Sequence, residues 1–239
     1  MSVNINTVYQ RVLAITNKEQ RGYITPQEFN YMANQAQLDI FEQYFYDLNQ
    51  FSRLPDSGNV NSDMVALIEE KISIFEKSTT VTESGGSNGH YLLPSDLYRL
   101  NNVFVQASRP DDFVDGNEAE LVTLQYFLKI NKTKLAAPTE ENPVYIQSSN
   151  KIEIFPRSIT QGVQFYYIKK PVEVKWGYDS ATGLYDSSSS KTTHFELHPS
   201  DETELVVKIL ALAGVILKDP GLYQIGSAEE VKNVQQEKA

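Results

Sequence analysis

Two histidines four residues apart, His194 and His198, come nearest to the spacing of a metal site. On a helix, this spacing places both imidazoles on one face, where they can hold zinc. Pro199 follows directly and the segment alternates like a strand, which also places both residues on one face. The zinc-protease order HExxH is not present. We therefore expect both histidines to be structural or solvent-exposed.

Three other segments carry polar residues but lack essential parts of a site. Residues 84–89 are glycine-rich but have no Gly-Lys-Ser/Thr to hold a phosphate. Residues 179–186 faintly resemble a calcium loop, without an oxygen ligand at the third position or a closing glutamate. We expect Asp111, Asp112 and Asp115 to form a solvated acidic turn. The sequence thus predicts no metal and no cofactor.

Nucleophilic catalysis finds no support in the sequence. The chain has no cysteine and no Gly-x-Ser-x-Gly elbow. Glycoside hydrolysis depends on the spatial separation of two carboxylates, and 31 acidic residues always offer some pair. We predict that the chain is not an enzyme, with a cell-wall hydrolase as an alternative.

Composition and charge exclude or disfavour several classes of protein. The chain has 239 residues, of which 41% are hydrophobic, so it can bury a real core and is not a disordered protein. Its net charge of −10 disfavours sequence-specific binding of nucleic acid. No apolar run approaches the ~18 residues of a membrane span, and the N-terminus does not resemble a signal peptide. We expect no membrane partner.

Two helices begin the framework that must position these residues. Apolar spacing predicts an amphipathic helix over residues 4–17. Thr25 and Glu28 form a capping box around Pro26, which predicts a second helix running to about Phe51. Its expected apolar face is wide and contains Phe29, Met32, Ala33, Ala36, Ile40, Tyr44 and Leu48, with Leu38, Phe41 and Phe45 beside them.

The aromatic end of this second helix has two interpretations. Tyr46 falls off the main apolar stripe, and Phe51 lies at the predicted helix end. Such residues are core by default, but rigid amphipathic aromatics also suit subunit interfaces. Tyr46 and Phe51 are therefore candidates for partner docking.

The middle of the chain reads mainly as strands. We expect a helix changing to a strand over 63–76, a short helix over 118–129 and a hairpin turn at 148–151. The predicted strands are 100–106, 144–147, 152–155, 163–167 and 193–197. The fold class is α+β, with a helical bundle from N- and C-terminal helices flanking an antiparallel β region. The expected regions are helical 1–77, β-rich 78–197, the bundle-completing helix 198–221 and an extended tail 222–239.

The last helix is the best signalled. Ser200 is the expected N-cap, and Asp201, Glu202 and Glu204 suit the helix dipole. Apolar residues recur at helical spacing, namely Leu205, Ile209, Leu212, Ala213 and Ile216. Residues 219–221, Asp-Pro-Gly, stop the helix.

The polar tail beyond this stop carries three apolar residues, Leu222, Tyr223 and Ile225. We predict that they are docking anchors for a partner. The alternative is that they fold back onto their own domain.

Residues 195–220 resemble the C-terminal part of head–tail adaptor, or connector, ring proteins of short-tailed phages of the podovirus or crAss-like type. Three earlier stretches fit the same family: 22–29, 91–98, and 151–156 leading into 165–171. Their order and spacing cover most of the chain.

The resemblance implies a structural virion protein, assembled in the bacterial host cytoplasm. It implies a ring of about twelve copies with a heterologous subunit interface. The implied partners are further copies of the chain, the portal protein, and tail or second ring proteins. Double-stranded DNA would pass through the channel without sequence recognition. A tail-hub component or a ring lower in the tail is the alternative.

Overall fold

The computed structural model describes residues 3–17, 24–51, 59–83, 89–106, 116–179, 182–188, 190–216 and 228. Its helices and antiparallel-rich sheets confirm the α+β class. The chain divides into two compact units, one made of Met1–Ile74 and Pro171–Ala239, the other of Phe75–Lys170. Residues 171–197, expected in the β-rich region, therefore belong with the helices.

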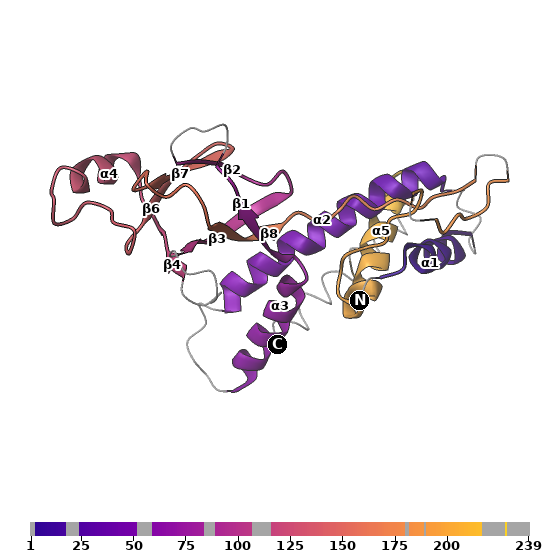
Figure 1. Cartoon of the computed structure of the whole chain (residues 1–239). Helices are drawn as coiled ribbons and strands as arrows, with labels where there is room; N and C mark the ends of the chain where they lie inside the picture. The colour runs from indigo at the N-terminus through magenta and orange to yellow at the C-terminus, as the bar shows by residue number, and fades with distance from the viewer. Residues whose placement is uncertain are drawn as a thin grey trace. The chain divides into compact units, whose positions relative to one another are not determined.

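The described residues of the first unit form four α-helices. They are α1 (Ile5–Asn17), α2 (Pro26–Phe51), α3 (Asn59–Ser73) and α5 (Glu202–Ile216). The long helix α2 contacts both α3 and α5, and α1 contacts α5 (Figure 1). The predicted helices 4–17 and 25–51 are confirmed, as is a helix at the start of 63–76.

The capping box predicted for α2 is present. The Glu28 carboxylate accepts hydrogen bonds from the Thr25 backbone N–H at 2.9 Å and hydroxyl at 2.7 Å, and the Thr25 hydroxyl oxygen accepts from the Glu28 N–H at 3.3 Å. The buried face contains Phe29, Met32, Ala33, Ala36, Gln37, Ile40, Phe41 and Tyr44. Leu38, predicted on the apolar face, is 41% exposed. It lies about 160° around the helix from Ile40, on the opposite side.

The start of α5 corrects the predicted cap. A 3₁₀ turn, η1 (Pro199–Asp201), precedes the helix, and His198 rather than Ser200 is its N-cap. The His198 Nδ1 accepts from the Ser200 N–H at 3.3 Å. The extra turn draws Asp201 into the interior, where it is 3% exposed. The predicted stop at 219–221 lies outside the described residues.

Among the residues that the structure describes, the predicted strand 193–197 finds no partner for a ladder. Thr193 and Phe195 make only isolated bridges, to Lys175 and Val3 respectively. In the neighbouring extended segment 172–176, Lys175 exchanges two backbone hydrogen bonds with Thr193. On its other side, the carbonyl of Val172 and both backbone groups of Val174 and Trp176 bind α2. Its second pairing partner is therefore a helix, which the alternation of 193–197 does not reveal.

Amide side chains on α2 take the place of a neighbouring strand. Asn30 accepts from the Trp176 N–H at 2.7 Å and donates to its carbonyl at 3.4 Å. Asn34 does the same for Val174, at 2.8 and 2.9 Å. The Gln37 side chain donates to the Val172 carbonyl at 2.9 Å. Four helix residues, the spacing from Asn30 to Asn34, rise about 6 Å and two strand residues about 6.6 Å, so the two repeats nearly match.

The second unit contains two four-stranded sheets. In the first, the order is β1-β8-β3-β4 and every pair is antiparallel: β1 (Glu76–Val81), β8 (Val163–Lys169), β3 (Leu97–Gln106) and β4 (Gly116–Glu118). In the second, the order is β2-β7-β6-β5, with β5 parallel to β6: β2 (His90–Leu92), β7 (Lys151–Phe155), β6 (Val144–Ser148) and β5 (Glu120–Leu121).

Both sheets contribute to one hydrophobic core. Its buried members are Tyr91, Val103, Val105, Ala119, Tyr145, Ile152, Ile154, Ile159, Val163, Phe165 and Tyr167. The alternation predicted for 152–155 and 163–167 is confirmed, because these strands bury every second residue over most of their length. The hairpin at 148–151 is also confirmed, and Ser149 adopts a φ of 41° at its turn.

The predicted helix over 118–129 is only partly correct. Helix α4 (Leu124–Ile130) begins at its Thr123 N-cap, whose hydroxyl accepts from the Tyr126 N–H. The residues before it form β4 and β5. Ala119 donates to the Val103 carbonyl at 2.8 Å, and this long-range pairing overrides the local helical pattern.

Candidate interaction surface

Exposed apolar side chains follow one another along and beside α4. We call Leu121, Leu124, Leu128 and Leu135 the α4 surface. Each is more than half exposed, and Leu135 is 96% exposed. Leu124 and Leu128 are one helical turn apart and share a face. Phe127, between them, is buried in a small cluster with Val122 and Val144 and anchors the helix to its sheet.

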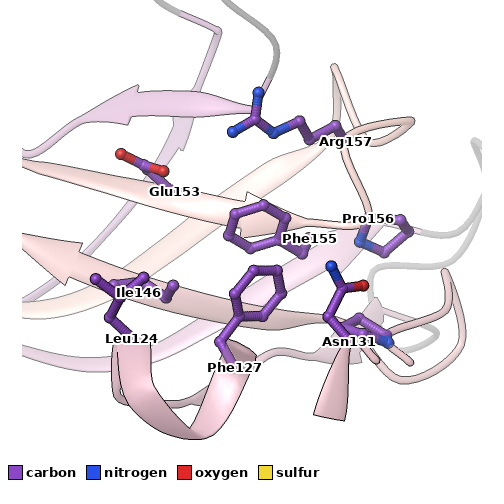
Figure 2. A pocket seen from close by; sticks show the side chains of 9 residues that line it. Leu124, Phe127, Asn131, Ile146, Glu153, Phe155, Pro156 and Arg157 are labelled. Carbon is purple, nitrogen blue, oxygen red and sulfur yellow. The ribbon is translucent and has the colours of Figure 1, made fainter. Parts of the chain in front are cut away.

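A cavity of about 500 Å³ opens beside α4. Figure 2 shows the Phe127 and Phe155 rings facing each other at its centre. Their centroids are 4.1 Å apart, and the Arg157 guanidinium lies 5.5 Å from the Phe155 centroid. Asn131 and Glu153 add polar atoms to the lining.

The lining of this cavity suits recognition. An apolar centre beside an amide, a carboxylate and a guanidinium can hold an aromatic side chain and pair with its polar tip. Glu153 is only a quarter exposed and lies 3.5 Å from Lys151, so its charge is balanced within the sheet. The arrangement therefore favours binding of an amphipathic side chain.

A second exposed row runs along α2. Tyr31, Leu38, Glu42 and Tyr46 form this row, which we call the α2 stripe. Their positions fall within about 80° of the helix circumference, opposite the buried face. Tyr31 and Tyr46 are 68% and 61% exposed. The stripe thus presents aromatic side chains on the side of α2 away from the core.

The predicted docking residues divide between described and undescribed parts of the chain. Tyr46 is exposed as an interface residue requires, whereas Phe51 is half-buried at the end of α2. Leu222, Tyr223 and Ile225 lie outside the described residues. Their docking role stays a prediction. The α4 surface was missed because its short helix offers too few turns for a clear period.

Both candidate histidines bind backbone groups. His194 Nδ1 accepts from the Ile5 N–H at 3.4 Å, and His198 caps η1. Among the residues that the structure describes, no group of three or more His, Cys, Asp or Glu is placed to hold a metal ion. Asp111, Asp112, Asp115 and residues 84–88 lie outside that part of the chain.

The segment resembling a calcium loop is closed by internal contacts. Gly183, with a φ of 70°, donates to the Asp179 carbonyl at 2.7 Å. Asp186 pairs with Lys191 at 2.8 Å, and this hydrogen bond lowers the pKa of Asp186 to about 2. The cation here is a lysine of the same turn.

Two further polar clusters escaped sequence reasoning. In the first unit, Asp201 binds Lys71 at 2.8 Å and accepts from the Tyr44 hydroxyl. In the second, Asp96 binds Lys77 at 2.9 Å and accepts from the Tyr167 hydroxyl at 3.0 Å. The Lys77 hydrogen bond lowers the pKa of Asp96, while burial raises the pKa of the Tyr167 phenol. Their partners are far apart in sequence, which hides the clusters.

No family model and no curated protein matches this chain. None of the helices in the described ranges is both long enough and apolar enough to cross a membrane.

Proposed function

We propose that this chain is a structural virion protein that forms a ring at a phage head–tail junction. The ring connects the portal to the tail and lines the channel through which DNA passes. Its partners are further copies of itself, the portal protein, and tail or second ring proteins. The protein acts by geometry rather than by catalysis.

The α4 surface is the observation that carries this proposal. The chain buries a large core in each unit, yet leaves the four leucines of this surface more than half exposed within 15 consecutive residues, 121–135. Apolar surface grouped in this way marks protein–protein contacts. The resemblance over 195–220 supports the specific phage role, and the net charge of −10 suits a channel that must not retain DNA.

Native mass spectrometry of the full chain, alone and mixed with the portal ring of the same phage, tests the proposal. We expect a complex that carries about a dozen copies on the portal. A chain that does not bind the portal would overturn the head–tail role. A specific complex with a tail protein instead would favour a ring lower in the tail.

Matched variants locate the contact. The double variant Leu128→Ser/Leu135→Ser should abolish or strongly weaken formation of the complex on the portal ring. Its thermal unfolding should be unchanged, because both side chains are exposed. Leu184→Ser, at an exposed leucine of the first unit, is the control and should bind normally. Equal binding by the double variant and the control would mean that the α4 surface is not a contact.

A further inference from the structure

We infer that the α2 stripe of one copy packs on the α4 surface of the next copy. This inference rests on the proposed ring and names the two faces of its subunit interface. The two faces are made of different residues on different units, so the contact is heterologous. Each copy then offers one face to either neighbour, as a closed ring requires.

Charge is the first reason to join these faces. Helix α2 carries Glu28, Asp39, Glu42 and Asp47 and contains no lysine or arginine. Residues 124–137 carry Lys129, Lys132 and Lys134 and contain no acidic residue. In a chain whose net charge is −10, this is a local reversal of sign.

The three lysines are also accessible. All three side chains are exposed, and no ion pair joins them to any residue within the described part of the chain. On α2, Glu42 is exposed between the two apolar positions Leu38 and Tyr46. Opposite charges beside the two apolar patches favour contact between the α2 stripe and the α4 surface in one alignment. They disfavour contact between two α2 stripes or between two α4 surfaces, because like charges would then face each other.

Side-chain shape is the second reason. The stripe presents two tyrosines, which join a rigid apolar ring to a hydroxyl group. The cavity beside α4 joins the stacked Phe127 and Phe155 rings to Asn131 and Arg157. A tyrosine of the stripe can bury its ring against the phenylalanines while its hydroxyl reaches the polar lining (Figure 2).

Cysteine cross-linking tests the pairing directly, because the natural chain contains no cysteine. One full-length sample carries Leu38→Cys and a second carries Leu135→Cys. The two are mixed, alone and on the portal ring, and treated with a bifunctional maleimide. Each chain has one thiol, so a product between the two variants is intermolecular. We expect a mixed dimer that the pair Leu38→Cys and Leu184→Cys does not form.

Charge reversal gives a second, independent readout. Replacing Lys129, Lys132 and Lys134 by glutamate should abolish the mixed dimer, and added salt should weaken it in the natural background. Asp39→Lys with Glu42→Lys on the partner chain should restore it to the reversed variant. Cross-linking that ignores both reversals would overturn the charge argument and the pairing with it.

The outcomes separate this inference from the proposed function. If the chain binds the portal but forms no mixed dimer, either in solution or on the portal ring, the pairing is overturned and the head–tail role is kept. A mixed dimer that responds to both charge reversals, formed by a chain that does not bind the portal, would establish the pairing and remove the head–tail role.

Discussion

At the residue scale, Asp201 is the most constrained charge in the first unit. Its side chain is 3% exposed and its two carboxylate oxygens face different partners, Lys71 and Tyr44. The Lys71 ammonium also lies 5.5 Å from the centre of the Tyr44 ring. These three residues come from three different helical elements, namely α2, α3 and η1. A buried charge of this kind is tolerated only while its partners remain.

We predict that Asp201→Ala destabilises the chain by about 3–5 kcal/mol, because the Lys71 ammonium loses its buried counter-charge. Urea unfolding measures the change. The control is Glu173→Ala, at an exposed carboxylate of the same unit, which should change the free energy of unfolding by less than about 0.5 kcal/mol. If the two substitutions change the free energy of unfolding equally, the Asp201 carboxylate does not stabilise the contact between these helices.

The pair of Asp96 and Lys77 predicts a pH dependence in the second unit. The Lys77 hydrogen bond lowers the folded-state pKa of Asp96 below that of the unfolded chain, about 3.9. Its stabilisation is therefore present above that value and is lost as the pH falls through the folded-state pKa. Because both side chains are at least a third exposed, it amounts to less than about 1 kcal/mol.

Asp96→Asn should accordingly be slightly less stable than the natural chain at neutral pH, and the difference should shrink below about pH 4. Urea unfolding at several pH values measures it. A difference that stays constant across this range would mean that the Asp96 charge contributes nothing.

At the element scale, α2 has three functions on three of its sides. One side is buried against α3 and α5, and the opposite side carries the α2 stripe. Between them, Asn30, Asn34 and Gln37 hydrogen-bond the extended segment 172–176. On the side that faces α2, the segment needs no neighbouring strand, because these amides satisfy the backbone N–H and carbonyl groups that point that way.

Asn34→Ala removes both partners of the Val174 backbone and should cost about 1–3 kcal/mol. The matched control is Gln35→Ala, one position along the helix, whose exposed amide bonds only Asp39 on the same helix. We expect less than about 0.5 kcal/mol for this control. Urea unfolding compares them, and similar values for both would show that the amide contacts do not hold the segment.

At the scale of the whole molecule, the second unit is a continuous piece of chain between the two parts of the first. Phe75 accepts a hydrogen bond from the Lys169 N–H at 2.9 Å, next to the β1–β8 pairing. The chain therefore enters and leaves this unit at neighbouring points. Such an insertion needs no long-range contact from outside to close its sheets.

We predict that residues 75–170 fold when expressed alone, because their core is drawn from both of their own sheets. Circular dichroism and a cooperative urea transition measure this. The companion variant replaces 75–170 with a short Gly-Ser linker and should keep the first unit helical. If the isolated segment shows no cooperative transition, the second unit depends on the rest of the chain.

Local signals in the sequence were enough for the α+β class, α1, α2, most of α5 and the β6–β7 hairpin. Helical period, the Thr25–Glu28 capping box and strand alternation act within a few residues, so they need no knowledge of distant partners. Of the predicted docking residues on α2, Tyr46 is exposed and Phe51 is half-buried, and their docking role remains a prediction. The roles of Leu222, Tyr223 and Ile225 remain predictions.

Tertiary structure decided the features whose partners are far away in sequence. Ala119 lies between two strands rather than in a helix because its N–H pairs with the Val103 carbonyl, and segment 172–176 pairs with amides 135 to 146 residues earlier. Asp201 is buried because Lys71 and Tyr44 meet it, although its position in the first helical turn suits an exposed charge equally well. The α4 surface is likewise visible only once Phe127 fixes which side of a short helix is covered. Local periodicity specifies elements, but burial and hydrogen bonding between distant residues select how each element is used.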